Sequence, residues 1–408
     1  MNSTPKSFAS AGTLKKIMAD HFYELDEASK TGNRKIAWCS SVGPVELLRG
    51  MGFLVYFPEN HAAMLGATRM ATELIPAANA LGFSPEICSY LTSDIGSYLQ
   101  QKTPLSRAYN IDSLPRPDIL VFNTNQCRDV QDWFSWYARE FKVPVTGVFT
   151  HRDIGIVKDH HLQDIARQLQ DLVPELETVA KEKFDPDRFK ETVRLSRETS
   201  RLWRACLETA QNIPSPWTFF DATIHMGPAV VARGTRTAID YYDLLLQELN
   251  ERVTASTAAV EGERHRIYWD GMPIWGKLRS LSEIFASLET CIVASTYCNS
   301  WIYEQLDPDT PFESMARAYT ELFIVRNEDY KEDYIRDHLD SYHCDGIIFH
   351  DAKTCPNNSN TRYSLPQRLQ AKHNIPTLTI EGDLNDLRCF SEEQSRTKIE
   401  AFVEQLEE

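Results

Sequence analysis

Three cysteines stand where a protein could use a thiol for chemistry. Cys127 ends the stretch RPDILVFNTNQC, in which a mostly apolar run over residues 119–123 passes into a polar loop. Cys355 follows the apolar triplet at 347–349 in the same way, and Cys88 lies behind a turn signal in GFSPEICSY. Ligands of open α/β sheets bind beyond the carboxyl ends of the strands. Thiols at these positions are therefore placed for catalysis or metal binding.

The alternative is that all three are ordinary buried thiols, since free cysteine is among the most often buried residue types. The chain has nine cysteines and no C-x-x-C pair. Their wide spacing lacks the local signature of a zinc ribbon or a bacterial ferredoxin. An odd, sparse set also argues against a disulfide scaffold and favours a reducing compartment. Spacing alone leaves both interpretations open.

The elements that must position these thiols alternate between strand and helix signals. Short apolar runs that end in polar loops predict eight strands, at 36–42, 54–57, 119–123, 144–149, 266–269, 291–295, 346–349 and 377–380. Helical periodicity predicts helices at 13–31, 45–49, 62–81, 93–101, 130–141, 238–253, 278–288, 318–339 and 393–407. Alternation of this kind is typical of parallel sheets covered by helices.

A long charged region, 159–212, is also expected to be helical, with interruptions at Pro174 and at Phe184-Asp185-Pro186. Asp185 is a predicted N-cap with Pro186 at the first helical position. The pattern predicts a first α/β domain with an N-terminal helix over 1–158, a helical region over 159–262 and a second α/β domain over 263–408. Two similar α/β halves would face each other across a ligand-binding cleft.

The length, composition and charge of the chain exclude several classes of protein. A chain of 408 residues is too long for one ordinary core, and 42% hydrophobic with 25% charged residues is typical of a globular protein. The net charge of -15 argues against a nucleic-acid partner. No apolar run reaches the roughly 20 residues that cross a bilayer, and the first residues have no long apolar signal region. We therefore expect a cytoplasmic protein with no membrane partner.

Six segments, in order along nearly the whole chain, carry a resemblance to a known family. The segments WCSSVGPVELL, YFPENHAA, EICSY, NQC, WDGMPIWGKL and EGDLNDLRCF together resemble the benzoyl-CoA reductase and 2-hydroxyacyl-CoA dehydratase family. The resemblance implies two Rossmann-like (flavodoxin-like) parallel-sheet domains with an intervening helical region. It also implies a [4Fe-4S] cluster held through three cysteines, which by position are Cys88, Cys127 and Cys355.

Other site residues follow from the same matching segments. The resemblance implies that Ser41 and Glu59 face the substrate thioester, with Ser41 donating a hydrogen bond to the acyl carbonyl and Glu59 moving a proton. The structural alternative for Ser41 is a loop serine bonded to the backbone. The alternative for Glu59 is a carboxylate at a helix N-terminus, where the helix dipole favours it. His61 is a third catalytic candidate and His350 a further proton donor, although each could be a structural histidine. Trp269 and Trp275 are expected in the core or the cleft wall.

The remaining cysteines are expected to be structural. Five lie in strand, helix or terminal contexts: Cys39, Cys206, Cys291, Cys344 and Cys389. Cys298, in STYCNSW, follows a strand and could approach the cluster or the substrate. The sequence leaves open a larger cluster, which would need a further ligand such as Cys298.

The chemistry implied is one-electron transfer to an acyl-CoA thioester, which makes a ketyl-like radical anion at very low potential. Two segments are more similar to the aromatic-ring reductases than to the dehydratases, namely EGDLNDLR and WDGMPIWGKL. They favour the iron-sulfur subunit of a benzoyl-CoA-type reductase, which is an oxidoreductase. The first alternative is a subunit of an (R)-2-hydroxyacyl-CoA dehydratase, a lyase, and the second is a non-catalytic relay or structural sibling. The chain has no GxxxxGK[ST] phosphate loop. The resemblance therefore implies a separate ATP-dependent activator, and with it a homologous sibling subunit in a heterodimer.

Overall fold

Two parallel sheets of four strands each organise the chain in the computed structural model, which describes residues 8–407. The strand orders are β2-β1-β3-β4 and β6-β5-β7-β8. Both orders have the flavodoxin-like form, in which the connection changes direction beside the first strand of the sheet. The predicted fold class is therefore confirmed. The predicted domain boundaries stay a prediction, and their outer ends, 1–7 and 408, lie outside the described residues.

All eight predicted strands are present. In the first sheet they are β1 (Ile36–Cys39), β2 (Leu54–Tyr56), β3 (Ile119–Asn123) and β4 (Val145–Val148). In the second sheet they are β5 (His265–Asp270), β6 (Thr290–Ser295), β7 (Gly346–Ala352) and β8 (Thr377–Gly382). In register, Trp38 of β1 lies between Tyr56 and Leu120, and Tyr268 of β5 lies opposite Ile347. Burial on both faces explains the continuous apolar runs of these strands, except in the edge strands β4 and β8, which are partly exposed.

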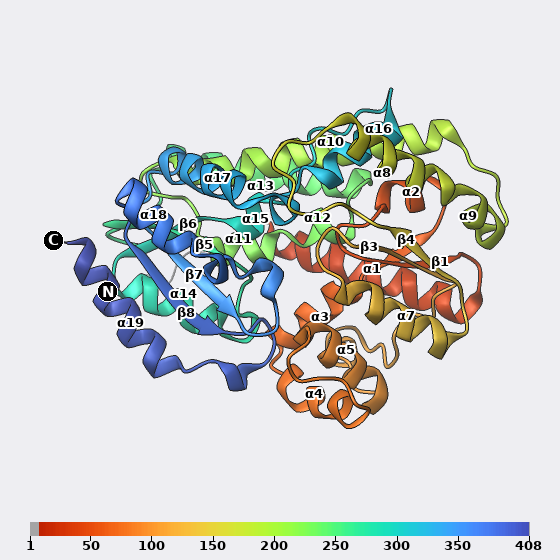
Figure 1. Ribbon diagram of the computed structural model, residues 1–408, viewed down its shortest axis with the longest axis horizontal. Coiled ribbons are helices and arrows are strands. Elements are labelled where there is room, and N and C mark those ends of the chain that lie inside the picture. Colours follow the sequence, from red (N-terminus) through yellow and green to blue (C-terminus); the bar gives the residue numbers. More distant parts are fainter. Residues whose placement is uncertain (1–7, 408) are drawn as a thin grey trace.

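Helices of the first half cover both faces of the first sheet. They are α1 (Ala11–Thr31), α2 (Val45–Gly50), α3 (Pro58–Ala67), α4 (Ala71–Ala80), α5 (Ser89–Gln100), α6 (Pro104–Tyr109) and α7 (Asp129–Phe141). Alternate residues of β1 enter different cores: Trp38 packs with the cluster around α7, and Ala37 with the cluster that continues into the second half. In Figure 1, α3, α4 and α5 form an orange group beside this sheet.

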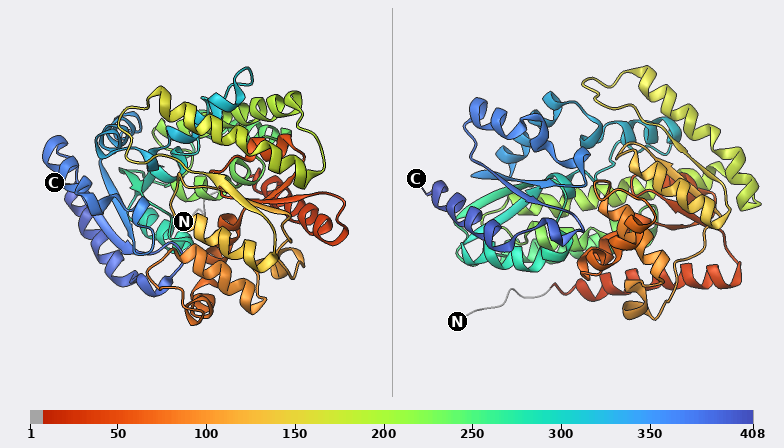
Figure 2. Two further views of the ribbon diagram at one scale, coloured as in Figure 1. Left: turned by 45° about the vertical axis from the view of Figure 1, so that its right-hand side comes forward. Right: turned by 60° about the horizontal axis from the view of Figure 1, so that its bottom comes forward.

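The middle of the chain is helical, as the sequence predicts. Its helices are α8 (Asp159–Asp171), α9 (Val173–Ala180), α10 (Pro186–Glu208), α11 (Phe219–His225), α12 (Gly227–Val231) and α13 (Arg236–Thr254). Pro174 stands in the first turn of α9. Asp185 caps α10 by accepting hydrogen bonds from the N–H groups of Asp187 and Arg188, at 2.9 and 3.1 Å. Figures 1 and 2 show α10 and α13 side by side along the molecule.

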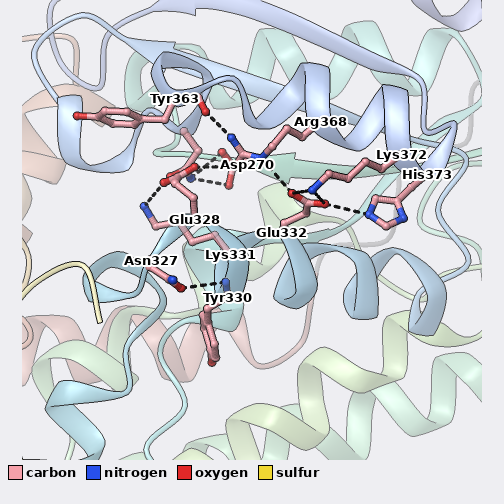
Figure 3. Close-up of polar contacts among 11 residues, drawn as sticks. Asp270, Asn327, Glu328, Tyr330, Lys331, Glu332, Tyr363, Arg368, Lys372 and His373 are labelled. Carbon is pink, nitrogen blue, oxygen red and sulfur yellow. Dashed lines mark hydrogen bonds and ion pairs between the residues drawn. The ribbon is translucent and has the colours of Figure 1, made fainter. Parts of the chain in front are cut away.

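The second half packs its own helices around β5–β8. They are α14 (Leu278–Ser287), α15 (Thr296–Asn299), α16 (Pro311–Thr320), α17 (Glu328–Ser341), α18 (Leu365–His373) and α19 (Glu392–Leu406). Figure 3 shows how α17 meets α18: Glu332 accepts from Arg368, Lys372 and His373 at 3.0 to 3.1 Å, and Glu328 accepts from Arg368 at 2.9 Å. This network fixes α17 against α18 on one side of the second sheet.

Two predicted helices are interrupted. The helix expected over 62–81 is two helices, because Arg69 adopts a left-handed conformation (φ 62°) between α3 and α4. The helix expected over 318–339 breaks between α16 and α17, where Arg326 forms a parallel bridge with Ile154 of the first half and Asn327 caps α17. Tertiary pairing and a new N-cap override helical periodicity there.

The polypeptide crosses between the halves more than once. After β6 the chain returns to the helical middle, where α16 packs on α8. A single buried core runs from α2 and α10 to the strands of the second sheet. No helix in residues 8–407 is long and apolar enough to span a membrane.

Candidate functional site

A cavity of about 990 Å³ lies between the halves, and the three predicted thiols line it. Cys127 follows β3 and Cys355 follows β7, so each lies at the carboxyl edge of the strand beside the first strand of its sheet. This is the position at which open α/β sheets bind ligands. Cys88 arrives differently, from the turn between α4 and α5. The cavity thus collects one thiol from the second half and two from the first.

Each thiol stands at the start of a helical segment. Cys88 is the N-cap of α5, Cys355 is the N-cap of a short 3-10 turn, and Cys127 comes directly before the N-cap of α7. Backbone N–H groups one turn on, at Leu91, Val130 and Asn358, act to lower the pKa values of Cys88, Cys127 and Cys355 respectively. Donors of this kind favour the thiolate form of a cysteine.

Burial has the opposite and larger effect on these thiols. It raises the pKa of Cys88 and Cys127 well above the usual value and that of Cys355 to about 12. Negative charge on Cys127 or Cys355 raises the pKa of Cys88 further, because like charges repel. A positively charged centre that bound all three would remove this repulsion.

One buried carboxylate, Asp383, joins the segments that carry Cys88 and Cys355. It accepts from the N–H and the hydroxyl of Thr354, at 2.9 and 2.6 Å, and from the hydroxyl of Ser89. The Ser89 N–H in turn donates to the Thr354 hydroxyl at 3.0 Å. Because Ser89 follows Cys88 and Thr354 precedes Cys355, this carboxylate sets the spacing of two thiols.

Arg152 joins the other pair of segments. Its guanidinium donates to the carbonyls of Asn125 and Gln126 at 3.1 Å, just before Cys127, and to the side-chain oxygen of Asn357 at 3.1 Å, just after Cys355. Burial lowers the pKa of Arg152, whereas the Cys127 thiolate raises it. Both thiol-bearing loops are therefore held by charged side chains that do not themselves line the cavity.

Ser41 and Glu59 meet at the same cavity. The Ser41 N–H donates a short hydrogen bond to Glu59 Oε2, and the side chains of Ser41 and Gln126 also bond this carboxylate. Burial raises the pKa of Glu59 to about 7, although these bonds oppose the shift. A carboxyl with such a pKa can both give and take a proton near neutral pH. Glu59 also stands in the first turn of α3, so the helix-terminal alternative holds together with the cavity position.

An ion pair beneath this loop holds the other side of Ser41. Arg233 and Glu46 are both buried, with Arg233 Nε donating to Glu46 Oε1 at 2.8 Å. The same guanidinium donates to the Ser41 carbonyl at 3.4 Å, and the Tyr319 hydroxyl donates to Glu46. The loop after β1 is therefore tied to residues from the middle and the second half of the chain.

The histidine candidates lie away from the cavity lining. His61 is fully buried, with Nδ1 2.5 Å from Asp94 Oδ1 and Nε2 2.9 Å from Thr103 Oγ1. His350 bonds the Met272 carbonyl through Nδ1 at 2.6 Å, and burial lowers its pKa. These contacts match the structural alternative for both residues. Of the two tryptophans, Trp269 stacks on Phe219 in the core, and Trp275 lines the cavity.

The other cysteines do not line the cavity. Cys298 is buried in α15, with its thiol 3.7 Å from the Thr223 hydroxyl, so the structure does not bring it to the other three. Cys39 and Cys291 lie within strands and Cys206 within α10, whereas Cys344 and Cys389 are half-buried.

Comparison with known proteins identifies the family. The model of the family "2-hydroxyglutaryl-CoA dehydratase, D-component" matches residues 40–406. The chain belongs to this family. It is 29% identical to the alpha subunit of (R)-2-hydroxyisocaproyl-CoA dehydratase from Clostridioides difficile, over 97% of this chain and 95% of the relative. It is 30% identical to the (R)-phenyllactyl-CoA dehydratase alpha subunit of Clostridium sporogenes, over 96% and 94%.

A benzoyl-CoA reductase is also similar to this member of the family. One subunit of the Thauera aromatica enzyme is 25% identical over 97% of this chain and 94% of the relative. Most of the curated relatives are nevertheless dehydratase subunits, so the comparisons favour the dehydratase alternative over the reductase that the sequence segments favour. The chain is therefore an enzyme subunit of the dehydratase and reductase family.

The thiols fit an iron-sulfur cluster better than a single ion. No group of three or more His, Cys, Asp or Glu side chains within residues 8–407 is arranged to hold one metal ion. In a cluster each cysteine ligates a different iron, so its thiols stand further apart than the ligands of one ion. Three thiols around one cavity, each supplied with a backbone N–H, satisfy that donor set.

Several site residues escaped sequence reasoning. Gln126 and Asp129 flank Cys127 in the sequence, and Asp129 accepts from the Cys88 N–H at 3.1 Å. Their position beside Cys127, a candidate ligand, is the sequence feature that could have identified them. Asp383 stands within the noted segment EGDLNDLR, but its partners lie far away in sequence. No motif or spacing in the sequence marks Arg152 as a site residue.

Proposed function

We propose that this chain is the cluster-bearing subunit of an (R)-2-hydroxyacyl-CoA dehydratase. The observation that carries the proposal is the meeting of Cys88, Cys127 and Cys355 with Ser41 and Glu59 at one cavity between the halves. The dehydratase alpha subunits that cover nearly the whole chain support the choice of reaction. Net elimination breaks the C2–OH and C3–H bonds of the substrate, forms a C2=C3 double bond and releases water.

The three cysteines would hold a [4Fe-4S] cluster, which supplies one electron at low potential when bound. The chain's own residues act on the thioester. In this proposal the Ser41 hydroxyl, which bonds Glu59 in the free chain, turns to donate to the acyl carbonyl, where negative charge develops. Glu59 would protonate the departing hydroxyl or accept a proton, a role that its pKa of about 7 supports. The buried wall of the cavity excludes water from the reduced substrate.

Two partners belong to this proposal. The relatives are themselves named as single subunits of their enzymes, which supports a second, different subunit in a complex. The resemblance to the family supports a separate ATP-dependent activator as the electron donor, and the chain has no phosphate loop of its own.

A benzoyl-CoA-type reductase subunit is the second candidate, favoured by the similarity to the Thauera protein. Aromatic side chains at the cavity, among them Tyr90, Trp275 and Tyr297, would also suit a ring substrate. Incubation of the full complex with either acyl-CoA separates the two candidates. An enoyl product supports the dehydratase, and a cyclic diene supports the reductase.

Iron and acid-labile sulfide per chain, measured on anaerobically purified protein with reduced-state EPR, test the cluster. About four of each are expected in the wild type, with a sharp fall in Cys355→Ala. Cys298→Ala is the matched control, because that thiol is buried and does not line the cavity; it should retain the iron. Absence of iron in protein kept strictly anaerobic would overturn the three-cysteine site.

A non-catalytic structural sibling makes a different prediction. Cys127→Ala should abolish turnover of the reconstituted complex if this chain binds a catalytic or relay cluster. Activity that survives the substitution would assign the chain a scaffold role.

A further inference from the structure

Cationic side chains are confined to the exposed part of the cavity wall. The charged residues that line the cavity are Lys15, Glu59, Arg69, Asp129, Asp221, Arg279 and Glu283. The three cations of this set, Lys15, Arg69 and Arg279, are all exposed. They suit the phosphates of a coenzyme A ester at the mouth, with the acyl end directed inward. Among the described residues, the buried lining has no cation.

The buried lining is apolar or aromatic instead. It includes Val42, Val130, Trp133, Trp301, Leu322 and Phe323, each at most 7% exposed. Two half-buried carboxylates lie beside the thiols: Glu59 is bonded by Gln126, the residue before Cys127, and Asp129 accepts from the Cys88 N–H at 3.1 Å. A second carboxylate on the acyl group would meet desolvation and like charge there.

The two arginines that hold the loops at the cavity, buried Arg233 and exposed Arg152, are already engaged. Arg233 is paired with Glu46 and contacts the Ser41 carbonyl. Arg152 donates to loop carbonyls and to Asn357. Neither lines the cavity, so neither offers a free donor to a substrate.

We propose, resting on the function proposed above, that the acyl group of the substrate is uncharged and apolar, with a branched aliphatic or aromatic side chain. A dicarboxylic acyl-CoA should bind more weakly because its distal carboxylate finds no cationic partner in the buried part of the cavity. Among the substrates in the names of the relatives, the inference favours acyl groups such as 2-hydroxyisocaproyl and phenyllactyl over 2-hydroxyglutaryl.

Binding of unreactive saturated analogues to the assembled complex tests the inference without turnover. Isothermal titration would compare 4-methylpentanoyl-CoA, 3-phenylpropanoyl-CoA and glutaryl-CoA. The two apolar esters should bind at least about ten-fold more tightly than glutaryl-CoA. Glutaryl-CoA binding as tight as the others would overturn the inference while leaving an acyl-CoA function in place. If none of the three binds, the proposed function fails, and the inference with it.

Two substitutions at one lining residue test whether the acyl group of the substrate lies against the cavity wall. Met272 lines the cavity and is half-buried, and lysine has a similar length and flexibility. Met272→Lys should tighten glutaryl-CoA relative to 4-methylpentanoyl-CoA by about ten-fold, whereas Met272→Leu should leave the ratio unchanged. Arg279→Ala, at the exposed mouth, should weaken all three esters to the same extent. An unchanged ratio in Met272→Lys would show that the acyl group does not reach this wall and would overturn the assignment.

Discussion

At the scale of single residues, Glu59 and His61 show how two neighbours on one helix take different roles. Both belong to α3, and successive residues of an α-helix are about 100° apart. Two positions along, the side chain therefore points to nearly the opposite side. Glu59 faces the cavity and Ser41, whereas His61 faces Asp94 in the core. The cavity position of Glu59 is therefore what supports its proposed role in proton transfer.

The raised pKa of Glu59 makes stability depend on pH. An unfolded glutamate releases its proton near its usual pKa of 4.5, but the folded protein holds this proton up to about pH 7. Between these values the folded state binds more protons, so the free energy of unfolding falls as pH rises. Glu59→Gln keeps an oxygen acceptor for the Ser41 N–H and removes this slope. We expect the variant to be more stable than wild type by about 1–3 kcal/mol at pH 8, and closer to it at pH 5.

Urea unfolding at a series of pH values measures this effect. Glu140, an exposed residue of α7, provides the control, since Glu140→Gln should leave the slope as in wild type. Equal stability of wild type and Glu59→Gln at every pH would contradict the raised pKa.

At the scale of elements, the thiol loops depend on side chains that come from elsewhere. Asp383, just after β8, bonds the first residue of α5 and the loop after β7. Asp383→Ala leaves the Ser89 and Thr354 hydroxyls without this acceptor and should lower the iron content although every cysteine remains. Asp386→Ala is the control, because Asp386 bonds Arg388 and neither thiol segment. Full iron content in Asp383→Ala would show that the loops hold their spacing without it.

The Glu46–Arg233 pair tests how the loop after β1 is held. Glu46→Gln leaves the Arg233 charge buried without its partner, which we expect to cost about 3–5 kcal/mol of unfolding free energy. Replacing both residues, by Glu46→Gln and Arg233→Met, should recover a large part of that loss because no unpaired charge remains. Urea unfolding of the two single variants and the double variant gives the coupling energy. Additive losses would mean that the two residues do not act as a pair.

At the scale of the whole molecule, the site depends on contacts between the halves. Cys88 and Cys127 come from the first half and Cys355 from the second, and the cavity wall combines α1, α3, α11 and α14. A cluster held by all three thiols would therefore join the halves and stabilise the folded chain by mass action.

Removal of the cluster should consequently lower thermal stability. We expect the Tm of the wild type to fall by about 5 °C or more on anaerobic chelation of iron, measured by differential scanning fluorimetry. Cys355→Ala, which disconnects the second half, should show a much smaller change. A wild-type Tm that is insensitive to iron removal would argue that the thiols do not bridge the halves.

The sequence by itself determined the architecture and the thiols. Period-two and period-3.6 patterns are local, so all eight strands and most helices could be predicted, and Cys127 and Cys355 could be placed beyond their strands. Only the tertiary structure decided which side chains meet. It broke the helix at 321–327, separated Cys298 from the other thiols and brought Asp383 to Ser89. These outcomes depend on partners distant in the sequence, and no local periodicity encodes such contacts.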